Sequence, residues 1–353
     1  FIPLKPAVCK RTLTDMKPTI LSAPHPRSLE LIFTAKRLAQ LRDSYEVIEV
    51  SEDEIANLSP QVLAQVRYII GQPPLDHLLL EQLKQLKCIF NVESNLMDNM
   101  PYDTLFERGI HVVTTGAVFA QPVAELALGL ALDLSRQITA AHQAFENGTE
   151  KWGLEGNPQA KLLFNSRVGM IGFGDLGKAL ATILAGFKPQ IKIYDPWLPN
   201  SFLSGIGTPS SLEDIFDSSD MIFVLAAVTT ENQHFINADL IARMPQGSSL
   251  VLLSRAEVID FPALINAVEK GHITAASDVW PLEPMPADHP VRQLPGFLKS
   301  AHRAGALQQC FEDMGEMVWE DLQLLDRGLP PLVCKRAQRE TASKMQSKPV
   351  SEN

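Results

Sequence analysis

Residues 168–195 constrain the fold of this 353-residue chain more than any other stretch. They begin with a short apolar run, residues 168–171, which has the length of a buried strand. Three glycines follow in the pattern GxGxxG, and apolar residues then recur at helical spacing. A second strand is predicted over residues 191–194, and Asp195 follows it. This order of strand, glycine turn, helix, strand and acidic residue is typical of a dinucleotide-binding unit.

The residues of the glycine turn have physical roles in such a unit. The first glycine allows a tight turn, the second lets the backbone approach a pyrophosphate, and the third allows the helix to pack closely on the strand. The backbone N–H groups at the start of the helix then face the phosphates. The predicted cofactor-binding residues of the turn are Gly172, Phe173, Gly174, Asp175, Leu176 and Gly177.

Asp195 indicates which dinucleotide binds. Its carboxylate would accept hydrogen bonds from the adenosine ribose hydroxyls. The next residues, Pro196, Trp197 and Leu198, include no arginine or lysine that could hold a 2′-phosphate. The sequence therefore predicts NAD as the cofactor rather than NADP. A glycine-rich turn in another kind of α/β domain is the alternative, but the strand, the helix and the placed acid together favour the cofactor.

Strand-like and helix-like segments alternate on both sides of this unit, which predicts parallel sheets covered by helices. Before the unit, strands are predicted over residues 19–22, 45–50, 68–70, 87–90 and 110–114. A long apolar helix is predicted over residues 123–137 and an amphipathic one over residues 304–325. Residues 335–353 are polar and charged, which predicts a disordered tail.

Composition and charge argue against several classes of function. The formal net charge of −10 disfavours nucleic-acid binding, which needs a basic surface. The four cysteines are scattered without a CxxC pair, which predicts no metal site and fits a reducing cytoplasm. Charged residues such as Glu125 and Asp133 interrupt the most apolar helical stretches. We therefore expect no transmembrane segment and no membrane partner.

Three polar residues in the second half of the chain follow predicted strands. Arg255 comes directly after residues 249–254, Glu283 follows residues 274–277, and His302 follows residues 297–300. Ligands of open α/β sheets bind outside the carboxyl ends of the strands, so these residues are candidates for chemistry. Taken singly, each has a plainer explanation as a surface ion pair, a solvated acid or a structural histidine.

Several motifs of the chain resemble those of the D-isomer-specific 2-hydroxyacid dehydrogenases. Residues 122–128, Pro-Val-Ala-Glu-Leu-Ala-Leu, resemble the Val-Ala-Glu helix of that family. Ser254-Arg255 resembles its catalytic-arginine motif, residues 278–284 its Asp-Val…Glu-Pro motif, and residues 300–302 its Thr-Pro-His motif. The match extends from about residue 87 to residue 302, and the order and spacing of the motifs make it specific.

The resemblance implies an architecture of two Rossmann-like domains, each a doubly wound parallel sheet, with a cleft between them. The substrate-binding domain would comprise residues 1–118 and 303–334, and the NAD-binding domain residues 119–302. The implied protein is an NAD-dependent D-2-hydroxyacid dehydrogenase, acting in practice as a 2-keto-acid reductase. Its substrate would be glyoxylate-like, hydroxypyruvate-like or phosphoglycerate-like. The family commonly forms homodimers through the NAD-binding domain, so a homodimer is expected.

The resemblance also implies a role for each candidate residue. A hydride moves between the substrate and nicotinamide while His302 takes or returns the hydroxyl proton, because imidazoles titrate near pH 6.5. Glu283 would orient that imidazole, and Arg255 would bind the substrate carboxylate and polarise its carbonyl. Further cofactor contacts are implied for Val228, Thr229, Ser254 and Asp278.

One loop departs from the family pattern and leaves the substrate open. Residues 94–97, Ser-Asn-Leu-Met, replace a Gly-Ala-Gly-type loop whose N–H groups bind the substrate carboxylate. Asn95 and Leu96 are its predicted substrate-binding residues, although a side chain at a glycine position restricts the backbone. Glu93 adds a negative charge, which would oppose a second anionic group unless it points away. His25 and Arg27 are the obvious basic residues that could bind a phosphate.

A second class of function is consistent with the same motifs. The family contains transcriptional corepressors that keep the fold and the catalytic residues. The altered loop at residues 94–97 favours such a non-catalytic, NAD(H)-sensing protein, whereas intact Arg255, Glu283 and His302 favour the enzyme. A turnover assay distinguishes the two.

Overall fold

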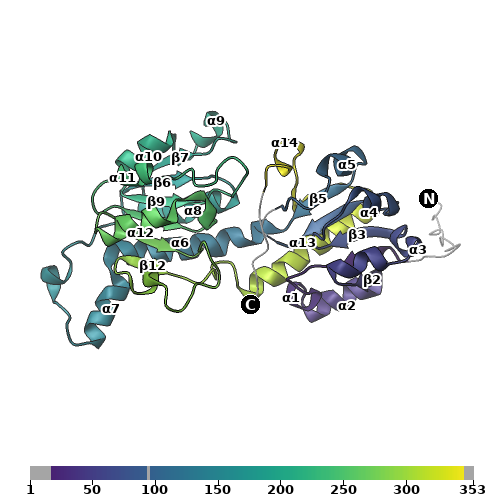
Figure 1. The fold of residues 1–353 in the computed structure, drawn as a ribbon, viewed down its shortest axis with the longest axis horizontal. Coiled ribbons are helices and arrows are strands. Elements are labelled where there is room, and N and C mark those ends of the chain that lie inside the picture. Colours follow the sequence, from purple (N-terminus) through teal and green to yellow (C-terminus); the bar gives the residue numbers. More distant parts are fainter. Residues whose placement is uncertain (1–16, 94–95, 346–353) are drawn as a thin grey trace, which may run out of the picture.

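The structure is a computed structural model that describes residues 17–93 and 96–345, and its strands form two sheets (Figure 1). The first sheet has the order β13-β5-β4-β3-β1-β2, and all its strand pairs are parallel except β13 with β5. Without β13 this is the order 2-1-3-4-5 of flavodoxin-like sheets. Its parallel strands are β1 (Thr19–Ser22), β2 (Glu46–Glu49), β3 (Val66–Ile70), β4 (Cys88–Asn91) and β5 (His111–Thr114).

Short helices connect these strands, as the alternating sequence pattern predicts. Several of them begin at a side chain that caps the first turn, such as Asp76 before α4 and Ser59 before α3. The helices are α1 (Leu29–Ile32), α2 (Ala35–Ser44), η1 (Glu52–Asn57), α3 (Pro60–Leu63), α4 (His77–Gln82) and α5 (Tyr102–Glu107).

The second sheet is fully parallel and has the order β12-β11-β10-β9-β6-β7-β8. Six of its strands follow the Rossmann order, with a switch point between β6 and β9, where ligands of such sheets bind. Two parallel sheets with covering helices confirm the predicted α/β fold class. The strands are β6 (Arg167–Ile171), β7 (Gln190–Tyr194), β8 (Thr208–Pro209), β9 (Met221–Val224), β10 (Ser249–Leu252), β11 (Thr274–Ser277) and β12 (Phe297–Lys299).

The helices of this part fill the positions between and beside the strands. A long helix, α6, leads from the first sheet to the second (Figure 1). The helices are η2 (Gly116–Phe119), α6 (Ala120–Arg136), α7 (Ile138–Glu146), η3 (Gly153–Gly156), α8 (Asp175–Leu184), η4 (Ala185–Phe187), α9 (Asn200–Leu203), α10 (Leu212–Ser218), α11 (Ala238–Ala242), η5 (Ala256–Val258), α12 (Phe261–Glu269) and η6 (Pro290–Gln293).

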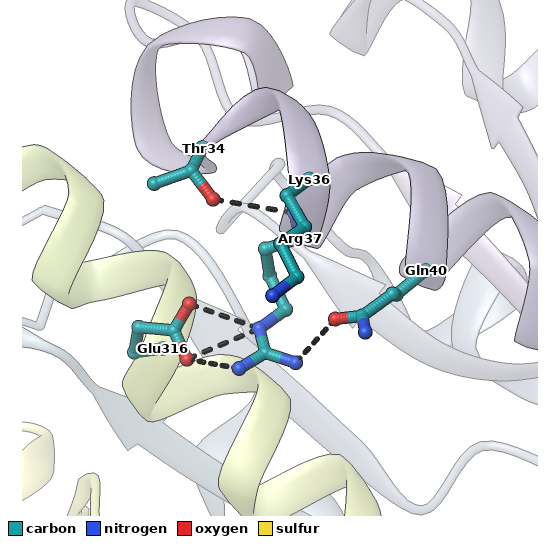
Figure 2. A pocket seen from close by; sticks show the side chains of 5 residues that line it. All are labelled: Thr34, Lys36, Arg37, Gln40 and Glu316. Carbon is teal, nitrogen blue, oxygen red and sulfur yellow. Dashed lines mark hydrogen bonds and ion pairs between the residues drawn. The ribbon is translucent and has the colours of Figure 1, made fainter.

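After the second sheet the chain returns to the first through α13 (Gln308–Asp326). Met314 and Val318 on this helix are fully buried in the same core cluster as Ile20 of β1. On the surface beside that core, Arg37 of α2 forms an ion pair with Glu316 of α13 (Figure 2). The Nε of Arg37 lies 2.9 and 3.0 Å from the two carboxylate oxygens, and these contacts link α13 to α2.

The start of α13 differs from the prediction of a helix over residues 304–325. The helix begins four residues later, at Gln308. The N–H groups of Arg303 and Ala304 donate instead to the carboxylate of Asp278, at 3.0 Å each. This tertiary contact holds the segment in a loop, although its local sequence is compatible with a helix.

The prediction of disorder after residue 334 was wrong for residues 335–345, which we call the C-terminal strap. It contains β13 (Lys335–Arg336), which pairs with β5, and α14 (Arg339–Ala342). Ala342 is fully buried in a core cluster of the first sheet. Polar composition predicted disorder, but the segment is ordered by its backbone pairing with β5 and by Ala342, Ala337 and Met345, which pack against the core of the first sheet. Residues 346–353 of the predicted tail lie outside the described residues.

The C-terminal strap also contacts the part of the chain that carries the second sheet. The Nζ of Lys335 lies 3.0 Å from the carboxylate of Asp175, and the Nζ of Lys344 lies 2.9 Å from that of Glu231. The N–H of Thr230 donates to the carbonyl of Lys344 at 3.0 Å. The strap therefore links the two parts beside residues predicted to bind the cofactor.

The helical segment Gly116–Arg136 differs from another expectation. Because of its charged residues we expected no stretch that could span a membrane, but by length and hydropathy this segment meets the criteria for a membrane-spanning helix. One face of α6, including Ala127 and Ala131, is buried in a core cluster of the second sheet. Leucines on its remaining surface, such as Leu126 and Leu130, are only partly covered. A helix that packs partly into a protein core meets the same criteria.

Candidate active site

The glycine turn after β6 has the geometry that the sequence predicted. Gly172 has a φ of +89°, and a Cβ there would lie 2.6 Å from the backbone of Ala226. A Cβ on Gly177 would lie 2.9 Å from the carbonyl oxygen of Gly172. Apart from Gly174 itself and its two chain neighbours, no described residue has an atom within 4 Å of a Cβ built on Gly174. The first and third glycines are therefore needed by the fold, and the second leaves open space beside the backbone.

The surroundings of this turn fit a bound dinucleotide. Gly174 precedes α8 and provides no side-chain cap, so N–H groups of the first turn remain for an anion. The carboxylate of Asp195 accepts hydrogen bonds from the N–H groups of Phe173, at 2.7 Å, and Trp197, at 2.9 Å. These bonds fix Asp195 at the end of β7, while its oxygens keep lone pairs for ribose hydroxyls.

Other predicted cofactor residues lie at the same carboxyl edge of the second sheet. Val228 and Thr229 follow β9 and are buried, and the N–H of Thr229 donates to Asn232 at 2.7 Å. The hydroxyl of Ser254, after β10, is buried and has no hydrogen-bond partner among the described residues. A buried hydroxyl in this state fits a group whose partner is a ligand.

His302 and Glu283 form a close pair. The Nδ1 of His302 lies 2.7 Å from Oε2 of Glu283, and the N–H of Trp280 donates to the other carboxylate oxygen at 2.8 Å. Because an ionised carboxylate only accepts hydrogen bonds, Nδ1 carries the proton and Nε2 is left for proton exchange. Burial alone would raise the pKa of Glu283, but the hydrogen bond and charge of His302 hold this pKa below its ordinary value.

The loop that carries His302 is fixed by contacts from two neighbouring segments. The backbone of His302 has a φ of +49°, and the N–H of His302 donates to the carbonyl of Asp278 at 2.7 Å. The indole N–H of Trp280 donates to the carbonyl of Ser300 at 2.8 Å. Trp280 was not predicted from the sequence to hold this loop, although it lies between Asp278 and Glu283, two residues that were predicted to belong to the site.

Asp278 makes contacts other than the one predicted for it. Its carboxylate is buried and accepts hydrogen bonds from the N–H groups of Arg303 and Ala304. These contacts position the loop of His302. The predicted contact with the nicotinamide carboxamide stays a prediction.

Arg255 follows β10, and its Nη1 donates to the carbonyl of Ser254 at 2.8 Å. Burial lowers the pKa of its guanidinium, while the carboxylates of Glu257, Glu283 and Glu93 oppose this effect. An arginine remains protonated under these conditions because its ordinary pKa exceeds 12. The charges of Glu283, which follows β11 of the second sheet, and of Glu93, which follows β4 of the first sheet, therefore both act on Arg255.

The first sheet contributes residues that the sequence analysis considered separately. Leu96 is buried, whereas Asn95 lies outside the described residues. Arg27, after β1, and Glu93, after β4, form an ion pair with 3.1 Å between Nε and Oε1. The pairing of Arg27 with Glu93 was not predicted from the sequence. It could have been predicted because both residues follow parallel strands, whose carboxyl ends meet at one edge of a sheet.

A dinucleotide turn beside an arginine and a carboxylate-oriented histidine defines an NAD-binding oxidoreductase. Comparisons with known proteins specify this class further. The family model "D-isomer specific 2-hydroxyacid dehydrogenase, NAD binding domain" matches residues 128–304. The chain belongs to the D-isomer-specific 2-hydroxyacid dehydrogenase family, whose members are oxidoreductases acting on the CH–OH group of 2-hydroxy acids. The predicted family, class of enzyme and cofactor are thereby confirmed.

Individual relatives agree with this family. A hydroxypyruvate reductase of Thermotoga maritima is 34% identical over 266 residues, which cover 73% of this chain and 84% of that protein. A glyoxylate reductase of Korarchaeum cryptofilum is 30% identical over 264 residues, covering 73% and 79%. The crystal structure of a phosphoglycerate oxidoreductase from Rhizobium etli is similar with a TM-score of 0.84 and 56% identity, and the match covers 92% of this chain and 100% of that one.

Proposed function

We propose that this protein is an NAD-dependent D-2-hydroxyacid dehydrogenase that acts in practice as a reductase of small 2-keto acids. The observation that carries the proposal is the 2.7 Å contact between His302 and Glu283, a carboxylate whose charge also acts on Arg255. The names of the relatives suggest three substrates for the test, which are glyoxylate, hydroxypyruvate and the 2-keto form of phosphoglycerate.

Each of the three side chains has a different role in this reaction. Arg255 binds the carboxylate of the 2-keto acid through its planar fork of donors and polarises the carbonyl group. When bound, the reduced nicotinamide supplies the hydride. His302 donates a proton from Nε2 to the carbonyl oxygen, and in the reverse direction it removes this proton from the hydroxyl. Glu283 stabilises the protonated imidazole and fixes its orientation.

The glycine turn and the neighbouring strand ends would hold the cofactor. The N–H groups at the start of α8 would bind the pyrophosphate, and Asp195 would accept hydrogen bonds from the adenosine ribose. Val228 and Thr229 would line the cofactor, and the hydroxyl of Ser254 would find its hydrogen-bond partner there. The residues after Asp195 include no basic side chain before Asn200, which favours NAD over NADP.

The test is NADH oxidation with glyoxylate, hydroxypyruvate, pyruvate, phenylpyruvate and 3-phosphohydroxypyruvate. We expect turnover of at least one substrate and a loss of roughly 10²–10⁴-fold in kcat for His302→Ala, the range for a general acid–base group. His77→Ala is the matched control, because His77 is exposed on α4, away from both the candidate site and α7. NADH binding without turnover of any 2-keto acid would contradict the enzyme and favour the NAD(H)-sensing protein.

We also propose that the protein is a homodimer formed through the part that carries the second sheet. Six large apolar side chains between residues 138 and 164 are exposed. Figure 1 shows α7 and the segment after it extending away from the second sheet. Such an apolar extension, together with the partly covered leucines of α6, suits burial against a second copy. The exposed side chains are Ile138, Phe145, Trp152, Leu154, Leu162 and Phe164.

The cysteines support a reducing compartment such as the cytoplasm. Cys88, Cys310 and Cys334 are free thiols and all are buried. Burial raises the pKa of each thiol, which keeps it in the unreactive protonated form.

A further inference from the structure

The ion pair between Arg27 and Glu93 occupies the place where the first sheet would bind a ligand. The strand order changes direction between β1 and β3, and ligands of such sheets bind at the carboxyl ends of the strands beside this point. Arg27 follows β1, and Glu93 follows β4, which pairs with β3. The pair therefore lies at the ligand-binding edge of its sheet.

The pair is built into the protein and is not a loose surface contact. The side chains of Arg27 and Glu93 are only 10% and 9% exposed, and their Nε and Oε1 atoms are 3.1 Å apart. The guanidinium of Arg27 also lies over the ring of Phe311 on α13, 4.8 Å from its centroid. Ring stacking and the ion pair together hold Arg27 in one orientation.

The backbone of Glu93 is fixed as well. Its N–H donates to the side-chain oxygen of Asn91 at 2.6 Å, and its carbonyl accepts a hydrogen bond from the hydroxyl of Thr114 at 3.1 Å. The amide of Asn91 in turn donates to Gln72, which follows β3. This buried network sets the direction in which the Glu93 side chain leaves the sheet.

The charge of Glu93 also acts on Arg255, the proposed catalytic arginine. Glu93 is one of the three carboxylates whose charge opposes the effect of burial on the pKa of Arg255. Glu283, the partner of His302, is another. The charges of two paired carboxylates thus act on Arg255: that of Glu283, which pairs with His302, and that of Glu93, which pairs with Arg27.

We infer that the Arg27–Glu93 pair selects 2-keto acids whose far end is uncharged, so that the carboxylate held by Arg255 is the substrate's single negative charge. This inference rests on the proposed function. An uncharged hydroxyl group can accept a hydrogen bond from Arg27 and donate one to Glu93 without separating them. A phosphate or second carboxylate has to displace Glu93 from Arg27 or lie beside its negative charge, and both are unfavourable where the charges are poorly hydrated.

The test compares two ligands that differ in a phosphate group, D-glycerate and D-3-phosphoglycerate. Each is titrated into the NADH-saturated enzyme, and the change in NADH fluorescence gives the Kd without any turnover. We expect the wild-type protein to bind D-glycerate at least about tenfold more tightly, a difference of one decade in Kd.

Two substitutions at the pair show which residue is responsible. Glu93→Gln keeps the size of the side chain but removes the negative charge beside Arg27, so it should shift the ratio of the two Kd values toward D-3-phosphoglycerate by at least about tenfold. The double variant with Arg27→Met should lose this gain because the cation is gone. Melting temperature and NADH affinity verify that each variant is folded.

Three results would overturn the inference. They are tighter binding of D-3-phosphoglycerate by the wild type, an unchanged ratio in folded Glu93→Gln, and a gain that survives in the double variant. If Glu93→Gln does not fold, the wild-type ratio and the single variant Arg27→Met, which should gain no affinity for the phosphorylated ligand, decide the question. Turnover is measured separately, so a failure of the proposed enzyme activity is distinguishable from a failure of this selectivity.

Discussion

Glu283 carries its charge in a partly buried position because His302 and the N–H of Trp280 stabilise the carboxylate. Its pKa is lower in the folded protein than the ordinary value of 4.5. The unfolded chain therefore takes up this proton at higher pH than the folded one, and the stabilisation is present above about pH 4.5 and is lost as the pH falls below it. We predict that, when the pH is lowered from 6 to 4, the melting temperature of Glu283→Gln falls less than that of the wild type.

The matched control for this prediction is Glu107→Gln, which removes an exposed carboxylate on α5. It should lose as much melting temperature as the wild type over the same range. Equal losses in all three proteins would show that the contact between Glu283 and His302 contributes nothing to stability.

At the scale of secondary-structure elements, α7 and the segment after it present apolar side chains that the described part of this chain does not cover. Trp152 is 76% exposed and Leu154 is 89% exposed, so a polar residue at either position removes little packing within one copy. We predict that the wild type is a dimer and that Leu154→Asp weakens dimerisation by at least about tenfold, the effect of losing one well-buried contact side chain. Light scattering during gel filtration over a range of concentrations measures this effect.

Leu78→Asp is the control for the dimer prediction. Leu78 is 73% exposed on α4 of the first sheet, far from α7 in the chain and in Figure 1. It should leave the mass and the concentration dependence unchanged. A monomeric wild type, or equal weakening by both substitutions, would contradict the proposed interface.

At the scale of the whole molecule, the C-terminal strap belongs to the first sheet by its backbone pairing and contacts the second part through Lys335 and Lys344. The contact at Glu231 adjoins Thr229, which is predicted to line the cofactor. We predict that Lys344→Glu, which places like charges together, speeds amide exchange at Thr230 and raises the Kd of NADH. The rise should not exceed about fivefold, since partly exposed ion pairs contribute little.

Hydrogen exchange with mass spectrometry and NADH titration at low and high salt check the prediction for the strap. The difference between wild type and variant should shrink at high salt, because screening weakens exposed charge pairs. Lys36→Glu on α2 changes the same charge away from the strap and should have no effect on either measurement. An unchanged exchange rate at Thr230 in Lys344→Glu would show that the strap does not hold this loop.

Much of the site was predictable because its determinants are local or follow strand ends in order. The steric demands at Gly172 and Gly177 come from a single turn between β6 and α8. Arg255, Glu283 and His302 each follow a strand of one parallel sheet, so an alternating sequence pattern already implies that they lie on a common edge. The order and spacing of these residues also carried the resemblance to the family.

The sequence by itself determined the α/β class, the dinucleotide turn and the choice of candidate catalytic side chains, since these depend on periodicity and on short motifs. The tertiary structure decided that Arg27 and Glu93 neutralise each other, that Asp278 holds the loop of His302, and that a polar tail becomes an ordered strap. Each of these outcomes depends on contacts between residues far apart in the chain. Local composition cannot encode them, because the free energy of such a contact depends on which partner the fold brings within reach.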